Sequence, residues 1–152
     1  MSPIVFSNDR MAITHAGKLL TCGWINAPTM VEMTALESEG RRASAEAGPM
    51  AFLNVVFAGV PNFPEPVRAA GARLTRDPLF ALGRAHVVLM PGFLGVAVTS
   101  FINTFTLLGR PPHPTKTFHA LPQATAWLCE KAGLQPEELA AGVETVRKQL
   151  QP

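Results

Sequence analysis

The first 25 residues alternate short apolar runs with turn residues. Residues 4–6, 11–14 and 19–25 are strand-like, and residues 15–18 supply a turn between the last two runs. Short β-prone runs separated by turn residues predict strands that pair as neighbours. We therefore expect an antiparallel hairpin to open the domain.

A helix start follows this hairpin. Thr29 and Glu32 have the spacing of a capping box, in which the hydroxyl and the carboxylate each accept a hydrogen bond from a backbone N–H of the first turn. Met33 and Leu36 continue the pattern at helical spacing, and Gly48-Pro49 ends it, since proline cannot supply the next donor. This segment is the first predicted helix.

The middle of the chain alternates buried strands with helices. Residues 50–60 form an apolar run without alternation, which is typical of a strand covered on both faces, and residues 84–90 form a second strand. The positions of Val67, Ala70 and Leu74 predict a helix between them. Residues 93–108 form the third predicted helix, with Gly109 as a left-handed cap.

The C-terminal part adds a short strand at residues 115–119, a helix at 123–131 and a last helix from Pro136. The last helix carries one apolar stripe, formed by Leu139, Val143, Val146 and Leu150. The order β-β-α-β-α-β-α-β-α-α predicts an α/β domain. We expect a small, mostly parallel mixed sheet with one antiparallel pair, right-handed crossovers and helices on both faces. Residues 1–133 are the predicted domain, and residues 134–152 an amphipathic helix packed on it or on a partner.

Composition favours a protein that binds an apolar partner over one that binds nucleic acid. Hydrophobic residues make up 47% of the chain and charged residues only 16%, so some apolar surface is available for a partner. The net charge of +2 includes no run of Lys and Arg, which argues against nucleic acid. Residues 1–10 lack the pattern of a secretory signal, and Cys22 and Cys129 lie outside any CxxC motif. We therefore expect a cytoplasmic protein with reduced thiols.

Residues 85–109 contain no Asp, Glu, Lys or Arg, a length that would suffice for a membrane span. The run is interrupted by Pro91-Gly92 and begins with a β-branched stretch, so a strand, a turn and a buried helix explain it better. No membrane span is predicted.

The third helix has an unusual surface pattern. Its aromatic and aliphatic residues can face a core, and they are Phe93, Val96, Phe101, Phe105 and Leu108. Thr99, Asn103 and Thr106 line the other side without a charge, which is typical of a surface covered by protein. These three residues, with Leu139, Val143, Val146 and Leu150, are the candidate interface. The cover could be the last helix of the same chain or a partner, and both remain open.

Known catalytic and metal-binding patterns do not occur. The histidines at 15, 86, 113 and 119 have no metal-ligand spacing, although two of them could meet in space. The sequence contains no nucleophile elbow and no phosphate-binding loop. We therefore predict neither an enzyme, nor a metal, nor a cofactor.

Two strand-to-helix connections are candidates for a ligand site. In parallel sheets, ligands bind at the carboxyl ends of the strands, where Asn62 and Phe63 are expected to approach Gly92 and Phe93. Free helix N–H groups could hold an anion there, and the two aromatic rings could cover an apolar group. Ordinary turns with core aromatics explain the same residues.

Residues 118–128 read Phe-His-Ala-Leu-Pro-Gln-Ala-Thr-Ala-Trp-Leu. Together with the element order, this segment resembles the STAS-like (anti-sigma-factor-antagonist-like) bacterial domains, over about residues 4–133. The resemblance implies their fold and a role in binding proteins or small ligands. Regulatory members are phosphorylated at a Ser or Thr after the central strand, whereas residues 61–65 here carry no hydroxyl. That departure puts a phosphorylation switch in doubt.

The function we expect is therefore a non-enzymatic interaction or regulatory module. It binds another protein or a second copy of itself, as a homodimer, through the third and last helices. The alternative is a protein that binds a small apolar or lipid-like ligand in the crevice at the strand ends.

Overall fold

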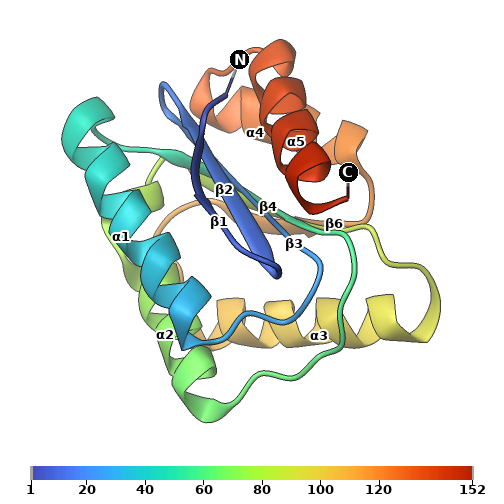
Figure 1. Ribbon diagram of the computed structural model, residues 1–152. Helices are drawn as coiled ribbons and strands as arrows, with labels where there is room; N and C mark the ends of the chain where they lie inside the picture. The colour runs from blue at the N-terminus through green and yellow to red at the C-terminus, as the bar shows by residue number, and fades with distance from the viewer. Residues whose placement is uncertain (1, 152) are drawn as a thin grey trace.

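The computed structural model describes residues 2–151, which form one six-stranded sheet between two layers of helices (Figure 1). The strands are β1 (Ile4–Ser7), β2 (Met11–Ala16), β3 (Leu19–Trp24), β4 (Ala51–Val56), β5 (Gly83–Val88) and β6 (Thr115–Phe118). They lie in the sheet in chain order. The helices are α1 (Met30–Ala47), α2 (Glu65–Arg76), α3 (Gly92–Gly109), α4 (Leu121–Ala132) and α5 (Pro136–Leu150), with a 3₁₀ turn at Pro78–Phe80.

The predicted fold class is confirmed, with one strand more than expected. β1, β2 and β3 pair antiparallel, and β3 to β6 pair parallel, so the sheet is mixed and mostly parallel. The predicted order placed two strands and one antiparallel pair before the first helix, whereas the structure has three strands and two such pairs. The difference arises because β1 is a separate edge strand that pairs with β2.

The two faces of the sheet are covered by different parts of the chain. α1, α2 and α3 cover one face, and α4 and α5 cover the other (Figure 1). This division follows from the strand order: β3 to β6 advance in one direction, and crossovers of one hand then place every connecting helix on the same side. Side chains alternate between the faces, so Phe52 and Asn54 face α1 to α3 while Leu53 and Val55 face α4 and α5.

The predicted start of α1 is confirmed. The Val31 N–H donates to Thr29 Oγ1 over 3.3 Å, and the backbone N–H of Thr29 donates to Glu32 Oε1 over 2.8 Å. Burial alone would raise the pKa of Glu32, but hydrogen bonds from Thr29 and Asn8 lower it overall. Glu32 therefore stays ionised at neutral pH and fixes the entry of the chain into α1.

The apolar stripe of α5 is buried inside the chain. Leu139, Val143, Val146 and Leu150 are all less than a tenth exposed, against β2, β3 and the residues beside them. At Gly142 the helix approaches β3 so closely that a Cβ would lie 2.4 Å from Thr21 Oγ1. The prediction that these four side chains face a partner is therefore wrong, since the sheet of the same chain covers them. α5 belongs to the domain through this packing.

The end of α3 differs from the prediction. Gly109 is the last helical residue, and Arg110 adopts the left-handed cap conformation with φ of 47°. A Cβ at position 109 would lie 2.6 Å from the side chain of Thr75 on α2. Glycine is therefore required there by the close approach of two helices and not by the backbone angle of a cap.

Candidate functional site

The outer surface of α3 is apolar and exposed. Within the described part of the chain, eight large apolar side chains are exposed, and five of them lie on this helix: Phe93, Leu94, Val96, Leu107 and Leu108. Phe93 is 84% exposed and Leu107 is 80% exposed. By length and composition, α3 is also the one described helix that could cross a membrane. We call these five residues the α3 patch.

Three of the five predicted inner residues of α3 are thus on the outside. Phe93, Val96 and Leu108 were expected in the core, but the large side chains that α3 buries there are those of Val98 and Ile102. Phe101 is partly buried against the core, and the side chain of Phe105 lies outside the described residues.

The predicted polar interface residues of α3 bond within the chain. Thr99 Oγ1 donates to the carbonyl oxygen of Gly95 over 2.8 Å, and Thr106 Oγ1 donates to that of Ile102 over 3.0 Å. Asn103 accepts a hydrogen bond from Thr117 Oγ1 of β6 over 2.9 Å. Thr99 and Thr106 therefore bond the backbone of their own helix, and only Asn103 of the three bonds another element, β6. The large side chains that α3 exposes are apolar.

Small residues occupy the middle of the exposed face. Ser100 and Thr104 are exposed and lie between Val96 and Leu107, at the three- and four-residue spacing of one helix face. Beside them, a surface groove runs between α2 and α3, lined by Ala69, Ser100, Phe101, Thr104 and Leu108 among others. The exposed face therefore carries large side chains at both ends and small ones at its centre.

The predicted crevice at the strand ends does not assemble. Asn62 and Gly92 are exposed, and Phe93 points into solvent. Phe63 is buried, with its ring centroid 6.0 Å from that of Trp24 in an edge-on arrangement. The two rings therefore do not cover one apolar space together, because Phe63 is buried in the domain and Phe93 is exposed.

The structure contains a cavity elsewhere, between the sheet and helices α1 to α3. Its volume is about 100 Å³, and its walls are mostly apolar, with Met33, Phe52 and Phe63 among them. Three polar side chains from the sheet also line it: Asn54 of β4, and Arg84 and His86 of β5. Of the predicted ligand residues, only Phe63 belongs to this cavity.

A chain of hydrogen bonds connects the polar wall of the cavity to the core. Trp24 Nε1 donates to Asn54 Oδ1 over 3.0 Å, and Asn54 Nδ2 lies 3.2 Å from His86 Nδ1. Since the indole can only donate, Asn54 must present its oxygen to Trp24 and its NH₂ to His86. His86 Nδ1 then accepts, and the proton of the neutral ring resides on Nε2. Burial, together with the positive charge of Arg84, lowers the pKa of His86 to about 4, which keeps the ring neutral.

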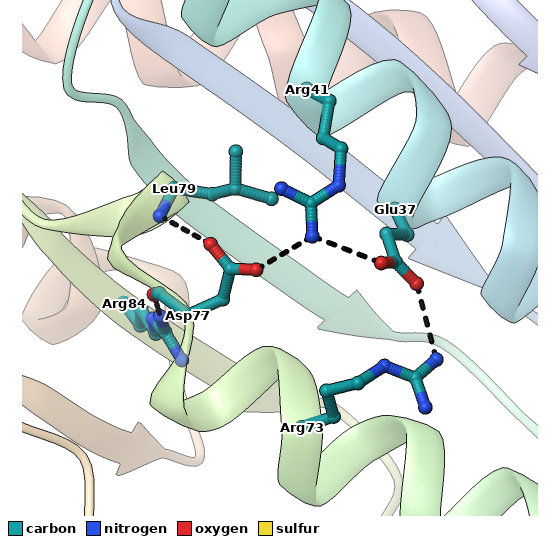
Figure 2. Close-up of polar contacts among 6 residues, drawn as sticks. All are labelled: Glu37, Arg41, Arg73, Asp77, Leu79 and Arg84. Atoms are coloured by element: carbon teal, nitrogen blue, oxygen red, sulfur yellow. Dashed lines mark hydrogen bonds and ion pairs between the residues drawn. The ribbon is translucent and has the colours of Figure 1, made fainter.

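Arg84 is a buried cation whose carboxylate neighbour is already engaged. Its side chain is 3% exposed, and its Nη2 donates to the backbone carbonyl oxygen of Asp77 (Figure 2). Its guanidinium also lies over the ring of Phe80, 5.5 Å from the centroid. Among the described residues, Nε has no hydrogen-bond partner. Burial lowers the pKa of Arg84 to about 10, partly offset by the charge of Asp77, so the group is cationic at neutral pH.

Figure 2 shows where the carboxylate of Asp77 is directed instead. Its Oδ2 accepts from Arg41 Nη2 over 2.8 Å, and its Oδ1 accepts from the backbone N–H of Leu79 over 3.0 Å. Arg41 also bonds Glu37, which in turn binds Arg73 of α2. Hydrogen bonds from Arg41 and Arg73 lower the pKa of Glu37. This exposed network ties α1 to α2 and leaves Arg84 without a carboxylate within ion-pair distance in the described chain.

The remaining candidate groups stay apart. In residues 2–151, no three His, Cys, Asp or Glu side chains gather into a set that could hold a metal ion. Cys22 is buried, and burial raises the pKa of its thiol, as it does for the half-buried Cys129. Both thiols are therefore protonated at neutral pH, which is not the state of a nucleophile.

The polar wall of the cavity was not predicted from the sequence, although a signal existed. Asn54 is the one polar residue in the apolar run at 50–60, and Arg84 and His86 stand two positions apart on a buried strand. Residues two apart on a strand share a face, and parallel neighbours in register bring Asn54 opposite His86. A search for polar residues that share one face of adjacent buried strands would have found these three residues.

Comparison of the chain with protein-family models, with curated proteins and with solved structures found no match. The resemblance to STAS-like domains therefore stays a prediction.

Proposed function

We propose that the chain is a non-enzymatic, cytoplasmic interaction module that binds a second copy of itself through the α3 patch. The observation that carries this proposal is the exposure of five large apolar side chains on one helix that has no charged residue over its whole length. Interfaces are depleted of charge at their centre and enriched in large apolar side chains, whereas a helix surface in water normally carries charges.

A membrane surface suits this helix less well than a protein does. Helices that bind a lipid surface usually carry Lys and Arg on the polar face, where they meet anionic headgroups. α3 has Thr, Ser and Asn there, and Thr117 of β6 engages Asn103. A membrane-spanning α3 would also place β5 and β6 on opposite sides of the bilayer, whereas they are paired strands of one sheet.

The distribution of side-chain sizes supports a second copy as the partner. Phe93 and Val96 lie toward one end of the exposed face, Leu107 and Leu108 toward the other, and Ser100 lies midway. In an antiparallel pair with its twofold axis at Ser100, the bulky end of one helix meets the opposite end of its partner. The small central residue permits close approach, and an uncharged face meets no like-charge repulsion when it pairs with itself.

Light scattering coupled to size-exclusion chromatography tests this proposal. We expect the wild-type chain to elute as a dimer and Leu107→Glu to elute as a folded monomer, because a carboxylate would be desolvated at the interface. Val31→Glu is the matched control, since Val31 is also an exposed apolar residue but lies on α1. A monomeric wild type, or equal effects of the two substitutions, would refute self-association through α3.

A further inference from the structure

Two side chains of the polar wall carry hydrogen-bond donors and lie on the same face of one strand. One of them is a cation and the other is a neutral ring. Arg84 and His86 lie two residues apart on β5 and both face the cavity. The Trp24–Asn54 pair fixes the His86 ring so that Nε2–H is the donor. Arg84 Nε has no hydrogen-bond partner among the described residues. Two donor-bearing side chains, one of them with an unpaired donor, therefore line a mostly apolar cavity.

The burial of the Arg84 cation indicates which charge a ligand of this cavity would carry. Burying a cation without a carboxylate partner is unfavourable, and proteins normally compensate it with an ion pair. Asp77 is close enough to influence Arg84, but its carboxylate bonds Arg41 and the N–H of Leu79. Among the described residues, the guanidinium thus receives a carbonyl oxygen and an aromatic ring but no carboxylate. An anion in the cavity would supply the missing charge.

We propose that the cavity between the sheet and α1 to α3 is a binding site for a short-chain aliphatic carboxylate. The carboxylate accepts hydrogen bonds from Arg84 and from His86 Nε2, and the tail packs among Met33, Phe52 and Phe63. The class follows from the walls: donors and one positive charge at one end, apolar side chains over the rest. A 150 Å³ apolar cavity holds benzene, so about 100 Å³ fits roughly four to six non-hydrogen atoms, the size of propionate or butyrate.

The first test compares probes on the wild-type chain. Butyrate, its neutral isostere butyramide and inorganic phosphate are titrated into the protein while the His86 ring signals are followed by NMR. We expect a saturable shift of the Nε2–H signal with butyrate at millimolar concentration, and binding of butyramide about tenfold weaker or less. Equal binding of butyramide, equal binding of phosphate, or the absence of a saturable shift with butyrate would each overturn the proposal.

The second test removes the charge. Arg84→Met keeps an apolar stem in place of the guanidinium, and we expect it to weaken butyrate binding about ten- to a hundredfold. Arg41→Met is the matched control, because Arg41 belongs to the neighbouring ion-pair network but does not line the cavity. Unchanged butyrate binding in Arg84→Met would contradict the assignment. If that variant fails to fold, the comparison of the three probes on the wild type decides the question.

Discussion

The indole nitrogen of Trp24 donates to Asn54 Oδ1 over 3.0 Å, and this bond determines which atom of the amide faces His86. The acceptor is buried, since Asn54 is 9% exposed. One donor on β3 thereby sets the tautomer of a ring on β5, two strands away.

The first prediction concerns this bond. Trp24→Phe leaves Asn54 Oδ1 without its donor in a buried position, so we expect a loss of about 2 kcal/mol in the free energy of unfolding, measured by urea denaturation. Trp127→Phe is the control, because that half-buried ring only packs beside Phe118. Equal losses in the two tryptophan variants would argue against the bond.

The second prediction concerns acid sensitivity. The pKa of His86 is about 4 in the folded chain and near 6.5 when unfolded, so the unfolded chain binds more protons between these values. Stability from the neutral ring is complete above pH 6.5 and decreases by about 3 kcal/mol as the pH falls to 4. The lowered pKa values of Glu32 and Glu37 act mainly below this window.

Urea unfolding at several pH values checks this sign. We expect His86→Gln to flatten the dependence between pH 6.5 and 4. His119→Gln, at an exposed position, is the matched control. A wild-type chain that is equally stable at pH 4.5 and pH 7 would show that His86 titrates normally.

The third prediction concerns the contact of α5 with the sheet. Gly142→Ala would place a methyl group into Thr21 Oγ1, so we expect it to destabilise the fold by about 1–3 kcal/mol, despite the better helix propensity of alanine. Ala140→Gly on the exposed side of the same helix measures the propensity contribution alone. A thermal denaturation experiment in which Gly142→Ala is more stable than the wild type would place α5 farther from β3.

Local chemistry explains why much of the fold could be predicted. The capping box at Thr29 and Glu32 and the stop at Gly48 depend on neighbouring residues, and both are present in the structure. The unalternating run at 50–60 correctly indicated a strand buried on both faces, because both helical layers cover β4.

The orientation of α3 could not be predicted in the same way. Its sequence is apolar nearly all round, so periodicity does not distinguish the inner face from the outer one. The structure resolves this through long-range contacts, because Gly109 lies against Thr75 and Thr117 bonds Asn103. The cavity was missed for the same reason: Asn54 and His86 are 32 positions apart, and only the register of β4 and β5 brings them together.

The account predicts a dimer in which two α3 helices face each other, and a distance measurement between spin labels tests this most directly. In a Cys129→Ser background, one label is placed at Ala69, beside the α3 patch, and in a second variant at Ala140, on the opposite helical layer. We expect the distance between the two copies to be clearly shorter for Ala69 than for Ala140. A shorter distance at Ala140, or no dipolar coupling in either variant, would contradict self-association through α3.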